Sequence, residues 1–231
     1  MPHKGIIYYI MSLDKHNHHV IIVSGFCDSG KRNKIIANSL EEAGLVPHVF
    51  KYSVKEWTID RAAMMLGVFV DTEIVKDETN IAVSFLSYEF GSLVTRYYVS
   101  HYKLLPARRC LIISDPFHKS DKYRNKKIGW LGHYRYGVPL TQLAEGPHGF
   151  PTFCGIPPIP FGVIVTGTKA PRKGGIYNNQ EIHDSLYVPR YMLKEAREVI
   201  YTPLTCKKAL TIKPVLNLAT SFLQHGWFKG N

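Results

Sequence analysis

The chain has 231 residues, of which 45% are hydrophobic and 20% charged, and its formal net charge is +11. A chain of this length and composition buries a sizeable core in one large domain or two small ones, which excludes an intrinsically disordered protein. No apolar run approaches the roughly 18 residues of a membrane-spanning helix, so the sequence predicts neither an integral membrane protein nor a membrane partner. The positive charge indicates polyanionic partners such as nucleotides, nucleic acid, or acidic protein or lipid surfaces.

The elements predicted along the chain alternate between strands and helices. We expect residues 1–18 to be an N-terminal extension and residues 19–231 to be one domain. Residues 20–23 form a continuous β-branched run, which is typical of a strand buried in a parallel sheet. The alternation predicts an α/β fold with a parallel sheet flanked by helices. The other predicted strands are 46–52, 110–113, 162–166 and 199–202, and the predicted helices are 35–43, 61–70, 79–105, 180–198 and 215–223.

The excess positive charge is concentrated in two segments. Residues 103–136 carry nine basic and two acidic side chains, and residues 167–231 carry ten and four. In the first segment aromatic residues alternate with cations, which suits single-stranded nucleic acid, although the same aromatics fit the core and rim of a folded domain equally well. The residues that we expect to contact nucleic acid are Lys122, Lys126, Lys127, Trp130 and Arg135.

The cysteines are far apart, form no C-x-x-C pair and follow no apolar signal segment. We therefore expect reduced thiols in an intracellular compartment, either the cytoplasm or the nucleus. Three histidines lie between residues 16 and 19, but no acidic or thiol partner follows at metal-site spacing, and we predict no metal site. The cysteines are Cys27, Cys110, Cys154 and Cys206.

One motif between the first predicted strand and the first predicted helix indicates chemistry. Residues 25–31 match the pattern G-x-x-x-x-G-K, in which backbone N–H groups hold phosphates and the lysine reaches the terminal phosphates of a nucleotide. The motif predicts a phosphate-binding loop with ATP as the cofactor. Arg32 replaces the hydroxyl residue that would bind Mg²⁺, and because arginine cannot ligate a cation we expect the loop to keep anion binding and to position Mg²⁺ less well. The expected cofactor-binding residues are Gly25, Asp28, Ser29, Gly30, Lys31 and Arg32.

This loop and four later segments together resemble the thymidylate kinase family of P-loop nucleoside monophosphate kinases, in particular its poxvirus-like branch. The four segments are residues 87–90, 112–120, 156–165 and 172–179. The resemblance covers roughly residues 18–225 and implies a five-stranded parallel sheet of the P-loop NTPase type. It also implies ATP-dependent phosphoryl transfer to a nucleoside monophosphate.

The resemblance assigns roles to individual residues. Lys31 would hold the transferred phosphoryl group, Asp115 would lie at the position of Mg²⁺ and the acceptor phosphate, and Arg172 would be a lid arginine. The residues that would bind the acceptor nucleotide are Glu89, Ser120, Tyr123 and Arg124.

Several positions depart from the family pattern, among them Arg32, Ser87 and Pro116. Phosphoryl transfer depends on positioning and charge stabilisation, so these losses leave three hypotheses open. The protein is a divergent nucleotide kinase, or a catalytically inactive kinase-fold protein that acts as a nucleic-acid-binding or structural module, or a kinase for nucleotides within DNA or RNA. The apolar stripe of the predicted helix 79–105 fits a homodimer interface and fits the core equally well.

Overall fold

Among the residues that this computed structural model describes, six parallel strands form one sheet in the order β2-β1-β3-β4-β5-β6. The structure describes residues 18–25, 30–53, 55–75, 81–102, 107–114, 142, 154–166 and 194–229. The strands are β1 (His18–Val23), β2 (Val46–Phe50), β3 (Ala82–Tyr88), β4 (Ala107–Ile113), β5 (Phe161–Val165) and β6 (Glu198–Tyr201).

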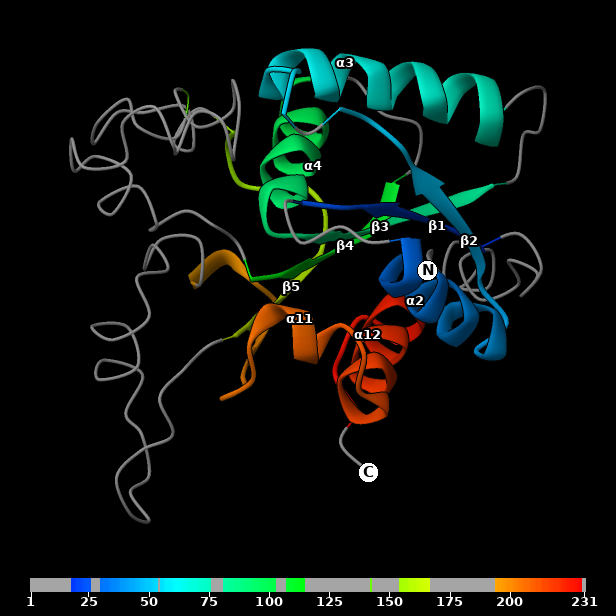
Figure 1. The fold of residues 1–231 in the computed structure, drawn as a ribbon, viewed down its shortest axis with the longest axis vertical. Helices are drawn as coiled ribbons and strands as arrows, with labels where there is room; N and C mark the ends of the chain where they lie inside the picture. The colour runs from blue at the N-terminus through cyan, green and yellow to red at the C-terminus, as the bar shows by residue number, and fades with distance from the viewer. Residues whose placement is uncertain are drawn as a thin grey trace, which may run out of the picture.

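Helices cover both faces of the sheet (Figure 1). On one face lie α3 (Ile59–Phe69), its π-helical continuation η2 (Val70–Val75) and α4 (Phe90–His101). On the other face lie α2 (Gly30–Glu42), α11 (Cys206–Ala209) and α12 (Lys213–His225). Among the described residues, no helix is long and apolar enough to cross a membrane.

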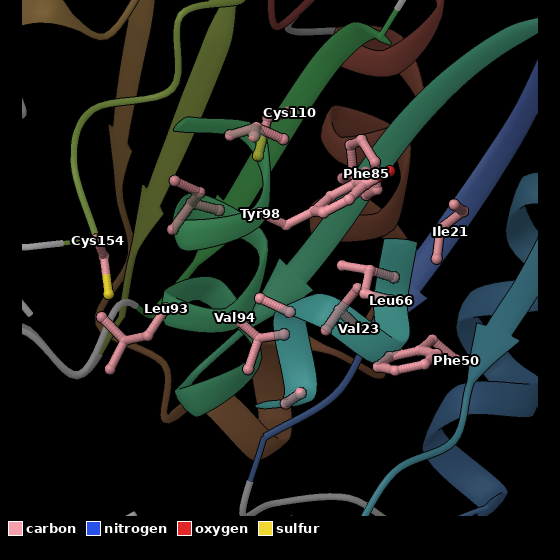
Figure 2. Packing of buried hydrophobic residues seen from close by; sticks show 14 of the residues in the cluster. Ile21, Val23, Phe50, Leu66, Phe85, Leu93, Val94, Tyr98, Cys110 and Cys154 are labelled. Atoms are coloured by element: carbon pink, nitrogen blue, oxygen red, sulfur yellow. The ribbon is translucent and has the colours of Figure 1, made fainter. Parts of the chain in front are cut away.

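Alternate side chains of each strand enter two separate apolar cores. In β1, Ile21 and Val23 pack with α3 and α4, whereas Val20 and Ile22 pack with α2 and α12. Figure 2 shows the first core, where Leu66 of α3 lies near Ile21 and Val23. Because both faces are covered, the central strands are continuous apolar runs rather than alternating ones.

The strand order creates a switch point between β1 and β3. The chain passes from β1 to β2 on one side and then returns to β3 on the other side of β1. In open parallel sheets, ligands bind in the crevice beyond the carboxyl ends of the two strands where the order reverses. The topology therefore places the candidate ligand site at the residues that follow Val23 and Tyr88.

The prediction of a five-stranded sheet was wrong, because the segment predicted as a helix over 79–105 contains a strand and a helix. Residues 82–88 form β3, and the helix begins only at Phe90. Every residue of β3 is buried, so the segment lacks the alternation of apolar and polar residues that marks a half-buried strand. Periodicity alone therefore does not distinguish a strand from a helix here. Strands coincide with the other predicted ones, whereas most of the predicted helix 180–198 lies outside the described residues. The division into an extension and one domain stays a prediction.

Candidate functional site

The chain passes from β3 into α4 through a single residue, Glu89. Its backbone has φ 49° and ψ −127°, a conformation that residues other than glycine rarely adopt and that costs about 1–3 kcal/mol. The Glu89 N–H donates to the carbonyl of Ile113 at the end of β4 (3.1 Å), and the Glu89 carbonyl accepts from the Ser92 hydroxyl (2.6 Å). The neighbouring strand and the first turn of α4 therefore hold this turn in place.

Two glycines allow the turn to pack directly against the end of β1. A Cβ atom on Gly91 would lie 2.1 Å from the carbonyl oxygen of Val23. A Cβ atom on Gly25 would lie 2.6 Å from both the Glu89 Cβ and the Phe90 nitrogen. Neither position has room for a side chain, so the ends of β1 and β3 approach as closely as the backbone permits.

Glu89 is thus an acidic residue at the switch point of the sheet, and it is only 8% exposed. Side-chain hydrogen bonds connect the segments around it. The Tyr52 hydroxyl donates to the carbonyl of Ser24 (2.5 Å), and the Tyr88 hydroxyl donates to Asn33 of α2 (2.9 Å). These bonds connect the ends of β1 and β3 to the segments on either side of them and limit movement of the turn.

The structure places the described residues of the predicted phosphate loop in two different settings. Gly25 packs against Glu89, whereas Gly30 and Lys31 are exposed in the first turn of α2. A phosphate loop needs converging N–H groups and positive potential, and an acidic side chain beside Gly25 opposes a bound phosphate. Arg32 is half-buried in the same helix.

Most of the other predicted site residues lie outside the described residues, so the structure does not place them. Glu89, predicted to bind an acceptor nucleotide, is instead the residue of the strand-to-helix turn. The undescribed residues are Asp28, Ser29, Asp115, Ser120, Lys122, Tyr123, Arg124, Lys126, Lys127, Trp130, Arg135 and Arg172.

Sequence reasoning missed the turn, although a short-range signal for it exists. The small residues Ser87 and Gly91 stand two positions before and two positions after Glu89, at the end of a buried apolar run. This spacing matches a G-x-S-x-G turn between a strand and a helix, with Ser87 in place of the first glycine and Glu89 in place of the serine. Reading residues 79–105 as one helix concealed it.

A second pair of chemically suggestive residues lies at the opposite edge of the sheet. The Nε2 atom of His18, at the start of β1, is 2.8 Å from the hydroxyl of Ser84 in β3. Ser84 is fully buried and His18 is 5% exposed, and burial, with Arg108 and Arg109 nearby, lowers the pKa of His18 to about 3. A serine hydroxyl bonded to a histidine is also the pairing of a nucleophile and its base. However, no substrate reaches a fully buried serine, so we interpret this hydrogen bond as structural.

Comparison with solved structures identifies the fold. No family model and no curated protein matches this chain. An esterase from Pyrobaculum calidifontis superposes with a TM-score of 0.59 at 13% identity, over 90% of this chain and 77% of the esterase. The Vlm2 thioesterase domain, bound to a dodecadepsipeptide, superposes with a TM-score of 0.54 at 11% identity, over 92% of this chain and 94% of that domain. The chain spans only 38% of the phospholipase PlaB from Legionella pneumophila, which it matches at 15% identity over 65% of its own length with a TM-score of 0.49.

These likenesses show the fold alone, and it is that of the α/β hydrolases. The resemblance to thymidylate kinases, the P-loop class and the predicted phosphoryl transfer were therefore wrong, and so was the alternative of an inactive kinase-fold protein. A glycine-containing turn between a buried strand and a helix occurs in both folds. In this chain Gly25 follows β1 and lets the backbone there pack closely against Glu89, the turn residue between β3 and α4. The expected ATP, Mg²⁺, nucleic-acid contacts and homodimer stay predictions that no finding tests.

Proposed function

We propose that this protein is an α/β-hydrolase-fold protein in which Glu89 replaces the serine nucleophile, so that it binds ligands at the switch point without serine-dependent ester hydrolysis. The observation that supports this is the backbone of Glu89 at φ 49° in the turn between β3 and α4. In α/β hydrolases the nucleophilic serine occupies this strained strand-to-helix turn. A carboxylate there has no hydroxyl to form the acyl-enzyme of an esterase.

The segment after the last strand supports the same proposal. In this fold the base of the triad is a histidine that follows the nucleophile and the acid in chain order. The described residues 202–212, between β6 and α12, contain no histidine, and the first histidine after β6 is His225 at the far end of α12. A serine at residue 89 would therefore receive no activation from a histidine in this segment.

A second candidate, a hydrolase with a carboxylate nucleophile, is favoured by the strain that the turn retains at Glu89. Backbone strain of this kind concentrates at functional sites. In this reaction a Glu89 oxygen would attack the acyl carbon of an ester, so that a mixed anhydride forms and the phenolate or alkoxide departs with its electron pair. Water would then attack the Glu89 carbonyl carbon of the anhydride, releasing the acyl group as a carboxylate and restoring the Glu89 carboxylate with one oxygen from water.

Acylation of three variants by p-nitrophenyl acetate tests the main proposal. We expect no turnover by the wild-type protein or by Glu89→Gln. Glu89→Cys should release a stoichiometric burst of p-nitrophenolate, because a thiolate is nucleophilic without a neighbouring base. The matched control is Glu195→Cys, an exposed thiol on the surface, which should acylate more slowly because no strained turn positions it.

The same assay separates the two candidates. Wild-type turnover that Glu89→Gln abolishes, with ¹⁸O from labelled water appearing in the Glu89 carboxylate, would contradict the main proposal and support the carboxylate nucleophile. Wild-type turnover that Glu89→Gln leaves unchanged would overturn both, because the reaction would then take place elsewhere.

A further inference from the structure

Three arginines gather at the edge of the sheet opposite Glu89, where the strands begin. Arg108 and Arg109 lie at the start of β4, and Arg197 directly precedes β6. The Nη1 atom of Arg109 donates to the carbonyls of Leu223 (2.7 Å) and Gln224 (3.1 Å) near the end of α12. The carbonyls at the end of a helix have no partners within the helix, and Arg109 supplies a donor for two of them. These two hydrogen bonds hold the Arg109 guanidinium in a fixed position.

Gly226 brings the third arginine to the same place. A Cβ atom on Gly226 would lie 3.0 Å from Nε of Arg109 and 3.2 Å from Nη1 of Arg197. The two guanidinium groups are therefore within about 6 Å of each other. The left-handed backbone of Gly226, with φ 84°, ends α12 and leaves room for both of them.

An irregularity in β4 places Arg108 in the same neighbourhood. Val83 pairs with Ala107 and the next residue, Ser84, pairs with Arg109, so Arg108 is an extra residue in β4. A bulge of this kind interrupts the alternation of side chains between the two faces and redirects the side chain at the bulge. Arg108 is close enough to Arg109 and His18 for its positive charge to contribute to the lowered pKa of each.

Within the described part of the chain, this cluster has no acidic partner. Among the residues that the structure describes, no carboxylate forms an ion pair with Arg108, Arg109 or Arg197. Glu198, next to Arg197, accepts a hydrogen bond from the backbone N–H of Phe228. Partial burial lowers the pKa of Arg109 to about 10, and the positive charges of Arg108 and Arg197 contribute to the same shift.

We infer that Arg108, Arg109 and Arg197 form a binding site for a phosphate group, presented by a free phosphate compound or by the headgroup of an anionic lipid. Guanidinium groups hold phosphate oxygens through paired N–H donors, and two guanidinium groups with nitrogens no more than about 6 Å apart can both reach one phosphate. The site is separate from Glu89, so it does not depend on the function proposed above.

Titration of the full chain with inorganic pyrophosphate, and sedimentation with phosphatidylcholine vesicles with or without phosphatidic acid, tests the inference. Trp227, which is 42% exposed and follows Gly226, is a fluorescent reporter, with Trp227→Phe as its control. We expect Arg108→Gln and Arg197→Gln each to weaken binding about tenfold, since each removes one charged contact. Arg61→Gln, an exposed cation on α3, should bind like the wild type.

The two arms distinguish the source of the phosphate. Binding of pyrophosphate with no preference for phosphatidic acid vesicles indicates a free compound, and the reverse result indicates a lipid headgroup. Failure of both probes to bind would overturn the inference. Equal binding by the wild type and the double variant Arg108→Gln/Arg197→Gln, with unchanged thermal unfolding, would overturn it as well.

Discussion

Gly25 and Glu89 lie so close together that a single methyl group on Gly25 would come within 2.6 Å of the Glu89 Cβ. This contact joins the end of β1 to the turn after β3, two segments that are more than sixty residues apart in the chain. It also explains why residue 25, two positions after the end of β1, is a glycine, since any side chain there would displace the strained turn.

Gly91→Ala is expected to destabilise the protein by more than about 3 kcal/mol, because the new Cβ would lie 2.1 Å from a backbone oxygen that is fixed within the sheet. Urea denaturation measures the change. The matched control is Gly30→Ala in the first turn of α2, where no atom lies within 4 Å of the new Cβ, and this variant should change stability by no more than about 0.5 kcal/mol. Equal effects of the two substitutions would show that β1 and α4 do not pack as closely as described.

Glu89→Gly is expected to be more stable than Glu89→Ala by about 1–2 kcal/mol. Both variants lose the carboxylate, but only glycine adopts φ 49° without strain. Chemical denaturation of the two variants side by side isolates the backbone contribution from that of the side chain. If alanine proved as stable as glycine, the turn would not hold residue 89 in the left-handed region.

Protonation of His18 should weaken the fold as the pH falls below about 6.5. Its pKa is about 3 in the folded protein and near 6.5 when unfolded, so the unfolded chain binds the extra proton between these values. Stability therefore rises with pH across this window by about 1.4 kcal/mol per unit for this group and is unaffected by it above the window. The measurement is the free energy of unfolding against pH for the wild type and for His18→Gln, which keeps a hydrogen-bonding group near Ser84. Parallel curves for the two proteins would contradict the assignment.

Arg96→Met should cost about 3–5 kcal/mol. Arg96 is fully buried in α4, and its Nε and Nη2 atoms both donate to the carbonyl of Gly155, in the segment that leads into β5. Methionine fills much of the volume but leaves this carbonyl without those donors in a buried setting. Thermal unfolding monitored by circular dichroism is the test.

Arg61→Met provides the comparison for Arg96→Met. Arg61 lies on the exposed side of α3 with its guanidinium over Trp57 at 5.2 Å, and its loss should cost less than about 1 kcal/mol. A small effect of Arg96→Met, similar to this control, would show that the segment before β5 does not depend on Arg96.

Local patterns in the sequence were enough to locate most strands and helices. The apolar runs at residues 20–23 and 110–113 lie within β1 and β4, and the helix predicted over 215–223 lies within α12. These features depend on interactions between near neighbours in the chain, and such interactions leave a periodic signal. The charge excess was also evident from the sequence, and the clustering of Arg108, Arg109 and Arg197 from two distant segments followed only from the fold.

The tertiary structure decided the order of the strands and the identity of the site. The residues from Ala82 to Tyr88 form a strand because β1 and β4 pair with both of its edges, and no periodicity within the segment records those partners. Glu89 adopts its strained backbone because Gly25, Ile113 and Ser92 hold it there, and two of these three lie far away in the chain. A loop motif such as residues 25–31 is compatible with more than one fold, because a glycine such as Gly25 lets whichever segment lies beside it approach closely. In this protein that segment is the turn at Glu89, and only the pairing of β1 with β3 brings the two together.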